Sequence, residues 1–144
     1  MSVISLEQAV KNGMEVERAA ERFYRLLADS TDDEEARTFL RELADQEVQH
    51  ATRIEKLGES LGAGELPKGA DDNVELLETA PSWAFVDGID YRQALVIALE
   101  NEEHAALYYS ALADAFEGVV AEFFQKLYKD EELHSKLLRE KVNT

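Results

Sequence analysis

The tetrapeptide Glu-x-x-His occurs twice in this chain of 144 residues, as Glu47-x-x-His50 and Glu131-x-x-His134. On an α-helix, residues three apart lie on one face, about one turn from each other. Each tetrapeptide interrupts a stripe of apolar residues, so a helix that turns its stripe inward buries a carboxylate and an imidazole together. Because an unpaired buried carboxylate is strongly unfavourable, the fold must supply partners for these groups.

The composition favours an all-α protein. Apolar residues make up 45% of the chain and charged residues 32%, with only 7 glycines and 2 prolines. The remainder is rich in Glu, Lys, Arg and Gln, which favour helices. Apolar stripes with helical spacing predict four helices, which cover residues 6–29, 32–61, 91–116 and, after the break at Glu117-Gly118, residues up to about 142.

The chain contains no cysteine and has a formal net charge of −16. The absence of cysteine excludes disulfides, iron–sulfur clusters and zinc–thiolate sites. The excess of acidic residues disfavours nucleic acid and anionic membranes as partners and favours cations. Since the sequence has neither a membrane-spanning apolar run nor a signal peptide, we expect a cytoplasmic protein.

The two halves of the chain repeat one pattern. FYRLLAD at 23–29 corresponds to YYSALAD at 108–114, and Glu17 corresponds to Glu102 at the same offset. In each half, a Glu-x-x-His tetrapeptide follows about 30 residues after this glutamate. We therefore expect two helical hairpins related by pseudo-twofold symmetry.

These hairpins, about 5–61 and 90–142, are expected to form a single domain over residues 1–144. The connection 62–90 is long enough to run the length of a helix. A long crossover between the second and third helices, with short turns elsewhere, is the connectivity of a ferritin-like four-helix bundle.

Packing the hairpins together would bring four glutamates and two histidines to the middle of the bundle. Two divalent cations would balance the four carboxylates, and oxygen ligands with one imidazole per metal suit iron or manganese. We predict a site for two iron ions, with manganese or zinc as alternatives, and leave open which two glutamates bridge the metals. The predicted ligands are Glu17, Glu47, His50, Glu102, Glu131 and His134.

Four further residues are candidates near this site. Glu103 lies at the edge of the apolar stripe of its helix and could be a seventh ligand. Glu21 follows Glu17 by one turn and could be an outer ligand or a carboxylate on the entry path. Tyr24 and Tyr109 are expected in the core, with their hydroxyls reaching the ligands.

The motifs resemble those of the rubrerythrin branch of the ferritin-like superfamily, over essentially all four helices. The resemblance implies a non-haem di-iron site that reacts with hydrogen peroxide or oxygen, often in a dimer. It rests on Glu17-x-x-Ala-x-x-x-Tyr24, Asp45-Gln46-Glu47-x-x-His50-Ala51, Glu102-x-x-Ala105-x-x-x-Tyr109 and Glu131-x-x-His134.

The sequence departs from that branch in two ways. Rubrerythrins proper carry a cysteine-ligated rubredoxin-like module, whereas this chain has no cysteine, so we expect an external electron donor or turnover of Fe(II) itself. Rubrerythrins also have an extra glutamate three residues after the first ligand of the third helix. Counted from Glu102, that position is Ala105, so we expect six ligands.

We therefore expect a di-iron oxidoreductase of the peroxidase or ferroxidase type, as a homodimer or larger homo-oligomer. Three alternatives stay open. The first is a ferritin-like protein that stores or delivers iron, and the second is a di-metal oxidase or oxygenase with an organic substrate. The third is a metal-free helical interaction domain.

Overall fold

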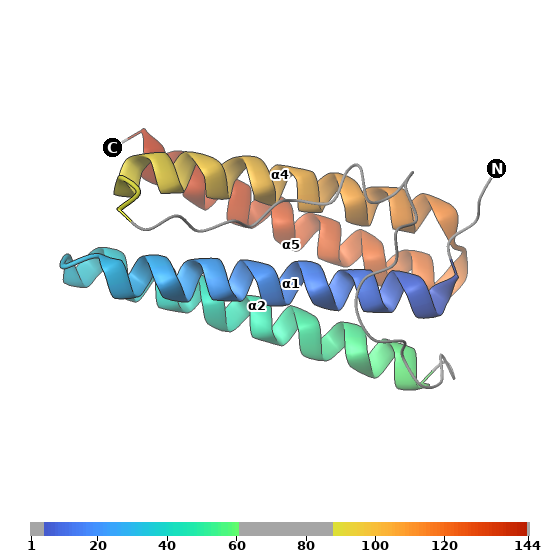
Figure 1. Ribbon diagram of the computed structural model, residues 1–144. Coiled ribbons are helices and arrows are strands. Elements are labelled where there is room, and N and C mark those ends of the chain that lie inside the picture. The colour runs from blue at the N-terminus through green and yellow to red at the C-terminus, as the bar shows by residue number, and fades with distance from the viewer. Residues whose placement is uncertain (1–4, 61–87, 144) are drawn as a thin grey trace.

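A computed structural model describes residues 5–60 and 88–143 (Figure 1). These residues form four helices, and the predicted all-α four-helix bundle is confirmed. The predicted helix ends agree with the structure to within two residues. The helices are α1 (Leu6–Ser30), α2 (Glu34–Ser60), α4 (Tyr91–Ala115) and α5 (Gly118–Val142).

Local hydrogen bonds explain where these helices begin. The Ser5 side chain accepts a hydrogen bond from a backbone N–H at the start of α1, and Asp90 does the same for α4. The backbone N–H of Thr31 donates back to the carbonyl of Ala28, so Thr31 still belongs to the end of α1. For this reason α2 begins two residues later than predicted. Gly118, with a φ of +66°, allows the short turn into α5.

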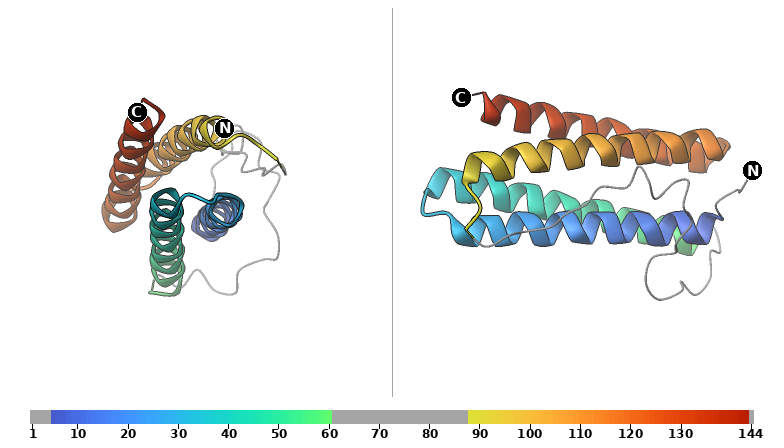
Figure 2. Two further views of the ribbon diagram at one scale, coloured as in Figure 1. Left: turned by 90° about the vertical axis from the view of Figure 1, so that its left-hand side faces the viewer. Right: turned by 45° about the horizontal axis from the view of Figure 1, so that its top comes forward.

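The bundle consists of two antiparallel hairpins that lie side by side, α1 with α2 and α4 with α5 (Figures 1 and 2). Seen along the bundle, α1 faces α4 and α2 faces α5 (Figure 2). The end of α2 and the start of α4 lie at opposite ends of the bundle (Figure 1), as the predicted crossover requires. Residues 61–87 of that crossover lie outside the described residues, and the single-domain organisation stays a prediction.

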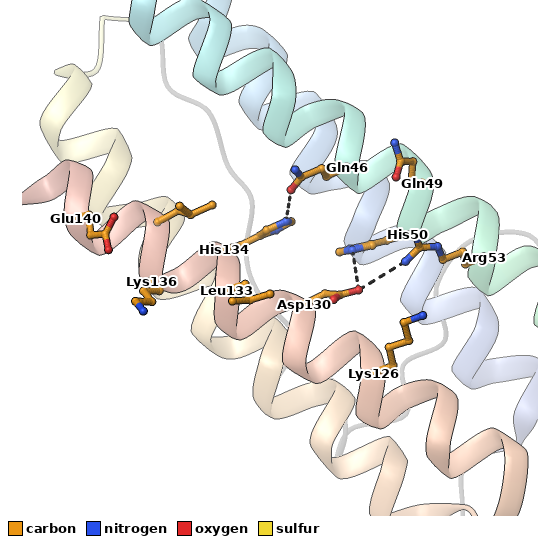
Figure 3. Close-up of a pocket in the computed structure, with 11 residues that line it drawn as sticks. Gln46, Gln49, His50, Arg53, Lys126, Asp130, Leu133, His134, Lys136 and Glu140 are labelled. Carbon is orange, nitrogen blue, oxygen red and sulfur yellow. Dashed lines mark hydrogen bonds and ion pairs between the residues drawn. The ribbon is translucent and has the colours of Figure 1, made fainter.

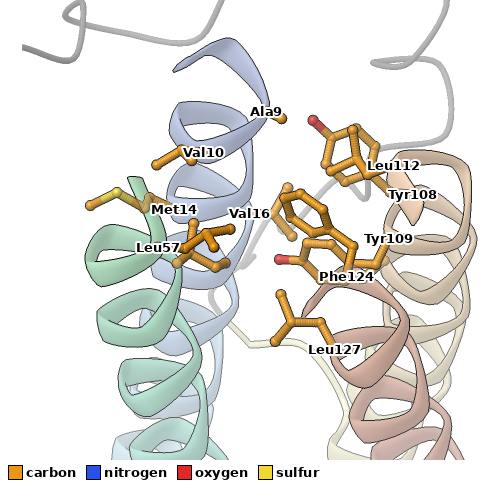
Figure 4. Packing of buried hydrophobic residues seen from close by; sticks show 12 residues of the cluster. Ala9, Val10, Met14, Val16, Leu57, Tyr108, Tyr109, Leu112, Phe124 and Leu127 are labelled. Carbon is orange, nitrogen blue, oxygen red and sulfur yellow. The ribbon is translucent and has the colours of Figure 1, made fainter. Parts of the chain in front are cut away.

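Two apolar clusters fill the bundle, one on each side of its middle. Figure 4 shows the cluster at the end where α1 begins. Most members of both clusters belong to the predicted apolar stripes, but Phe23 and Tyr108, which those stripes did not include, are buried as well. None of the described helices has the length and apolarity needed to cross a membrane. The first cluster centres on Val10, Ile54, Tyr108, Tyr109, Leu112, Phe124 and Leu127. The second centres on Phe23, Tyr24, Leu27, Leu40, Leu43, Leu95 and Leu138.

We expect Leu138→Ala to lower the free energy of unfolding by about 2–5 kcal/mol, because it leaves a cavity in the second cluster. Leu138 is 0% exposed, whereas its neighbour Leu137 is 43% exposed. Urea denaturation of both variants tests this, with Leu137→Ala as the control expected within about 0.5 kcal/mol of the unsubstituted protein. Equal losses in the two variants would contradict the observed packing.

Candidate metal centre

The six predicted ligand residues lie together in the layer between the two apolar clusters. All four helices contribute: Glu17 lies on α1 and Glu102 on α4, while α2 and α5 each carry one Glu-x-x-His tetrapeptide. All six residues are buried, with no more than 5% of any of them exposed. The helical spacing in the sequence places each group on an inward face, and antiparallel pairing brings the four faces to one level.

The ligand atoms of these residues form two overlapping groups of four. One group contains Glu17 and His50, the other contains Glu102 and His134, and both contain Glu47 and Glu131. Within each group the atoms lie within 4.8 Å of one another. The sequence left open which glutamates two metals would share. In the structure, Glu47 and Glu131 occupy the shared positions.

Each histidine turns its Nδ1 atom toward glutamates of both hairpins. His50 Nδ1 lies 3.1 Å from Glu131 Oε1 and 3.5 Å from Glu17 Oε2. His134 Nδ1 lies 3.0 Å from Glu47 Oε1 and 3.5 Å from Glu102 Oε2. The two imidazole rings are stacked, with centroids 5.4 Å apart and 16° between their planes. The arrangement is therefore close to twofold symmetric.

The other ring nitrogen of each histidine has a partner that sequence reasoning missed. His50 Nε2 lies 3.5 Å from Asp130 Oδ2, and His134 Nε2 is hydrogen-bonded to Gln46 Oε1 (Figure 3). Both partners directly precede the glutamate of the opposite tetrapeptide. This shared place in the repeat is the signal that could have identified them. Such partners orient a histidine for metal binding.

The two tyrosines of the repeat cross between the hairpins. The hydroxyl of Tyr24 donates to Glu102 Oε1, and that of Tyr109 donates to Glu17 Oε1, both at 2.7 Å. Burial, followed by the charge of these glutamates, raises the pKa of both tyrosines well above 10. Both hydroxyls therefore keep their protons and act as hydrogen-bond donors to the glutamates.

The candidates Glu21 and Glu103 lie outside the buried cluster. Glu21 forms an ion pair with Arg25 at 2.7 Å, and Glu103 forms one with Arg139 at the same distance. The Glu103 side chain is 46% exposed. Both residues sit away from the centre of their apolar stripes, so their helices direct them to arginines at the surface. The structure therefore brings six of the eight predicted acidic and histidine candidates together and places the other two outside the cluster.

The four buried glutamates differ in their affinity for protons. Burial raises the pKa of Glu47 and Glu131, and the charges of Glu17 and Glu102 raise it further, well above 4.5. Burial also raises the pKa of Glu17 and Glu102, but their polar contacts lower it by more, so the net shift of both is downward. Contacts with Glu47, His50 and Tyr109 lower the pKa of Glu17 to about 2. Without metal, the shared glutamates therefore bind protons more readily than Glu17 and Glu102 do.

The cluster fits a pair of divalent cations. Among the described residues, five buried atoms of these side chains form no hydrogen bond of normal geometry: Glu17 Oε2, Glu47 Oε1, Glu102 Oε2, Glu131 Oε2 and His134 Nδ1. Buried polar atoms in native proteins are nearly always hydrogen-bonded, so five unpaired atoms in one layer fit a role as metal ligands. Carboxylate oxygens with one imidazole per metal suit iron, manganese or zinc.

We expect the metal-free protein to lose stability as the pH rises from about 5 to 8. Above the usual value of 4.5, unfolded Glu47 and Glu131 release protons that the folded protein still binds. The raised pKa of His134 acts in the same direction above 6.5. Urea denaturation in the presence of a chelator measures the trend.

Replacing both shared glutamates, as Glu47→Gln/Glu131→Gln, should flatten this pH dependence, because amides do not titrate in this range. A metal-free protein whose stability increases with pH over the same range would contradict the assigned protonation.

Comparison with known proteins identifies the family. A family model for Rubrerythrin matches residues 4–88, which is more than half of the chain. No curated protein matches. The solved structure of the hypothetical protein Pfu-1136390-001 from Pyrococcus furiosus is similar, with a TM-score of 0.75 and 20% sequence identity. The similarity covers 97% of this chain and 89% of that one, and at this identity it supports the fold alone. The chain belongs to the Rubrerythrin family.

Proposed function

We propose that this protein binds two iron ions between its hairpins and reacts with hydrogen peroxide or oxygen, as a peroxidase or ferroxidase. The observation that supports this most directly is the pair of buried four-atom groups that share Glu47 and Glu131. Membership of the Rubrerythrin family favours iron over manganese and zinc. When bound, two Fe(II) ions would supply the two electrons that reduce hydrogen peroxide to water.

The side chains have distinct roles in this proposal. Glu47 and Glu131 would contribute to both metal positions, Glu17 and His50 to one of them, and Glu102 and His134 to the other. As ligands, Glu47 and Glu131 would have to release the protons that their raised pKa favours, since only ionised carboxylate oxygens are good ligands. Two divalent ions add four positive charges and two protons leave, so the net charge of the cluster rises by two on loading.

The tyrosines hold Glu17 and Glu102, each of which belongs to only one of the two four-atom groups. Because Tyr24 and Tyr109 each occupy one oxygen of these carboxylates, the other oxygen, Oε2, is left to face the cluster. The hydroxyls thus fix which oxygen serves as the ligand. The same hydrogen bonds close the α1–α4 side of the site.

Small oxidants can approach from the opposite side. A groove of about 620 Å³ lies between α2 and α5, with His50 and His134 among its lining residues (Figure 3). Arg53 and Leu133 also line this groove. A water-sized molecule in it reaches the edge of the histidine pair without any opening of the bundle.

The alternative with an organic substrate requires an apolar pocket beside the metals. The stripes suggested such a gap only at Gly13. In the structure, a Cβ atom at Gly13 would lie 3.2 Å from Ile54 Cδ1 and 3.7 Å from a ring carbon of Tyr109. Those side chains fill the space, so this position offers no substrate pocket. The homo-oligomer and the external electron donor stay predictions.

We expect the purified protein to bind two iron ions per chain and to consume hydrogen peroxide when loaded with Fe(II). The Glu47→Gln/Glu131→Gln variant should lose most of this iron, because both bridging carboxylates are removed. Metal analysis after anaerobic loading measures the stoichiometry, and stopped-flow absorbance follows the oxidation of iron.

Glu103→Gln is the matched control, since it removes a carboxylate from the surface ion pair with Arg139 and should leave two irons bound. If the double variant bound and oxidised iron as well as the unsubstituted protein, the proposed function would be wrong. Measuring the assembly size separates the two iron reactions, because storage requires a closed shell and a peroxidase does not.

A further inference from the structure

The two proposed metal positions have matching ligands, but different residues contact the Nε2 atoms of their histidines. We propose that Asp130 and Gln46 make the positions unequal, so that the one served by His50 binds its metal ion first and more tightly. This inference rests on the proposed two-metal function. Asp130 and Gln46 would act as positioning residues, through the imidazoles.

The two residues occupy equivalent places in the repeat. Gln46 precedes Glu47, and Asp130 precedes Glu131, so the same offset of 84 relates both pairs. Each side chain reaches across to the histidine of the other hairpin and meets its Nε2 atom (Figure 3). The Asp130 carboxylate lies at ion-pair distance from Nε2 of His50 and the Gln46 oxygen at hydrogen-bond distance from Nε2 of His134, and both oxygens favour an imidazole proton on Nε2. The lone pair of Nδ1 is then directed at the cluster in both halves.

The chemical difference lies in the charge of the acceptor. A carboxylate that accepts from Nε2–H makes the opposite nitrogen of the ring a stronger donor to a metal, and it adds a negative charge near the cation. An amide oxygen orients the ring but brings no net charge. His50, with Asp130 behind it, should therefore be the stronger ligand, although Gln46 holds His134 at the shorter distance.

Arg53 competes for the same carboxylate. Its guanidinium lies 3.6 Å from Asp130 Oδ2, the oxygen that also faces His50. A purely structural reading is that Asp130 forms a surface ion pair with Arg53 and leaves the metal unaffected. However, the Arg53 side chain is 48% exposed, so water screens its charge, whereas the His50 side chain is 6% exposed. The geometry thus favours an effect on His50, which an experiment can separate from the ion pair.

The test follows which histidine binds metal first. Protein with ¹⁵N-labelled histidine is titrated with Zn²⁺, a diamagnetic probe, and the ring nitrogens of its three histidines are observed by NMR. His104 is exposed and serves as an internal reference. In the unsubstituted protein, the first equivalent of Zn²⁺ should shift Nδ1 of His50, and the second should shift Nδ1 of His134.

Three variants assign the cause. Asp130→Asn keeps the shape of the side chain but removes its charge, and should weaken binding at the His50 position by about 10-fold or more. Gln46→Glu should strengthen the His134 position, and the double exchange Gln46→Glu/Asp130→Asn should reverse the order of filling. Glu140→Gln, which removes a carboxylate from the same groove, is the control and should change neither the Zn²⁺ affinity of either position nor the order of filling.

Simultaneous filling of both positions in the unsubstituted protein would overturn the inference, as would an unchanged order in the double exchange. If Asp130→Asn fails to fold, Gln46→Glu alone decides, because it adds a charge without removing a contact partner of Arg53. Failure of the proposed function looks different. In that case neither histidine shifts with Zn²⁺, and the variants have no binding to alter.

Discussion

The burial of four carboxylates at one level of a helical bundle is the constraint on which this structure depends. Among the described residues, no lysine or arginine is buried beside these carboxylates, so their charge is balanced by other means. The raised pKa of Glu47 and Glu131, the hydrogen bonds from Tyr24 and Tyr109 and the imidazoles all contribute. The remaining unpaired oxygens are tolerable if cations bind there, because two divalent ions match four carboxylates. The residues whose burial costs stability are therefore the same ones that would bind the proposed metal ions.

The polar layer also joins the two hairpins. The shortest contacts of its tyrosines and histidines cross from one hairpin to the other: Tyr24 to Glu102, Tyr109 to Glu17, and the histidines to the opposite tetrapeptides. The apolar clusters on either side bury the larger surface, but such packing tolerates small shifts of one helix along another. Directional hydrogen bonds do not, so the polar layer sets the register in which the hairpins meet.

The same layer has two different sides. Toward α1 and α4, the hydroxyls of Tyr24 and Tyr109 donate hydrogen bonds to Glu102 and Glu17 and link the two helices. Toward α2 and α5, the histidine rings border a groove whose rim includes charged residues. The proposed reaction with small oxidants would need an open side for exchange and a closed side that holds the ligands, and the distribution of tyrosine and histidine among the four helices is compatible with both.

The sequence by itself determined the helices, their inward faces and the six residues of the buried cluster. Helical periodicity depends only on residues close in the sequence, and the internal repeat shows the same pattern in both halves of the chain. Only the tertiary structure decided that Glu47 and Glu131 take the shared positions, that Asp130 and Gln46 stand behind the histidines, and that Glu21 and Glu103 turn to arginines. Periodicity places a side chain on a face of its own helix, whereas its partner depends on how distant helices are set against each other.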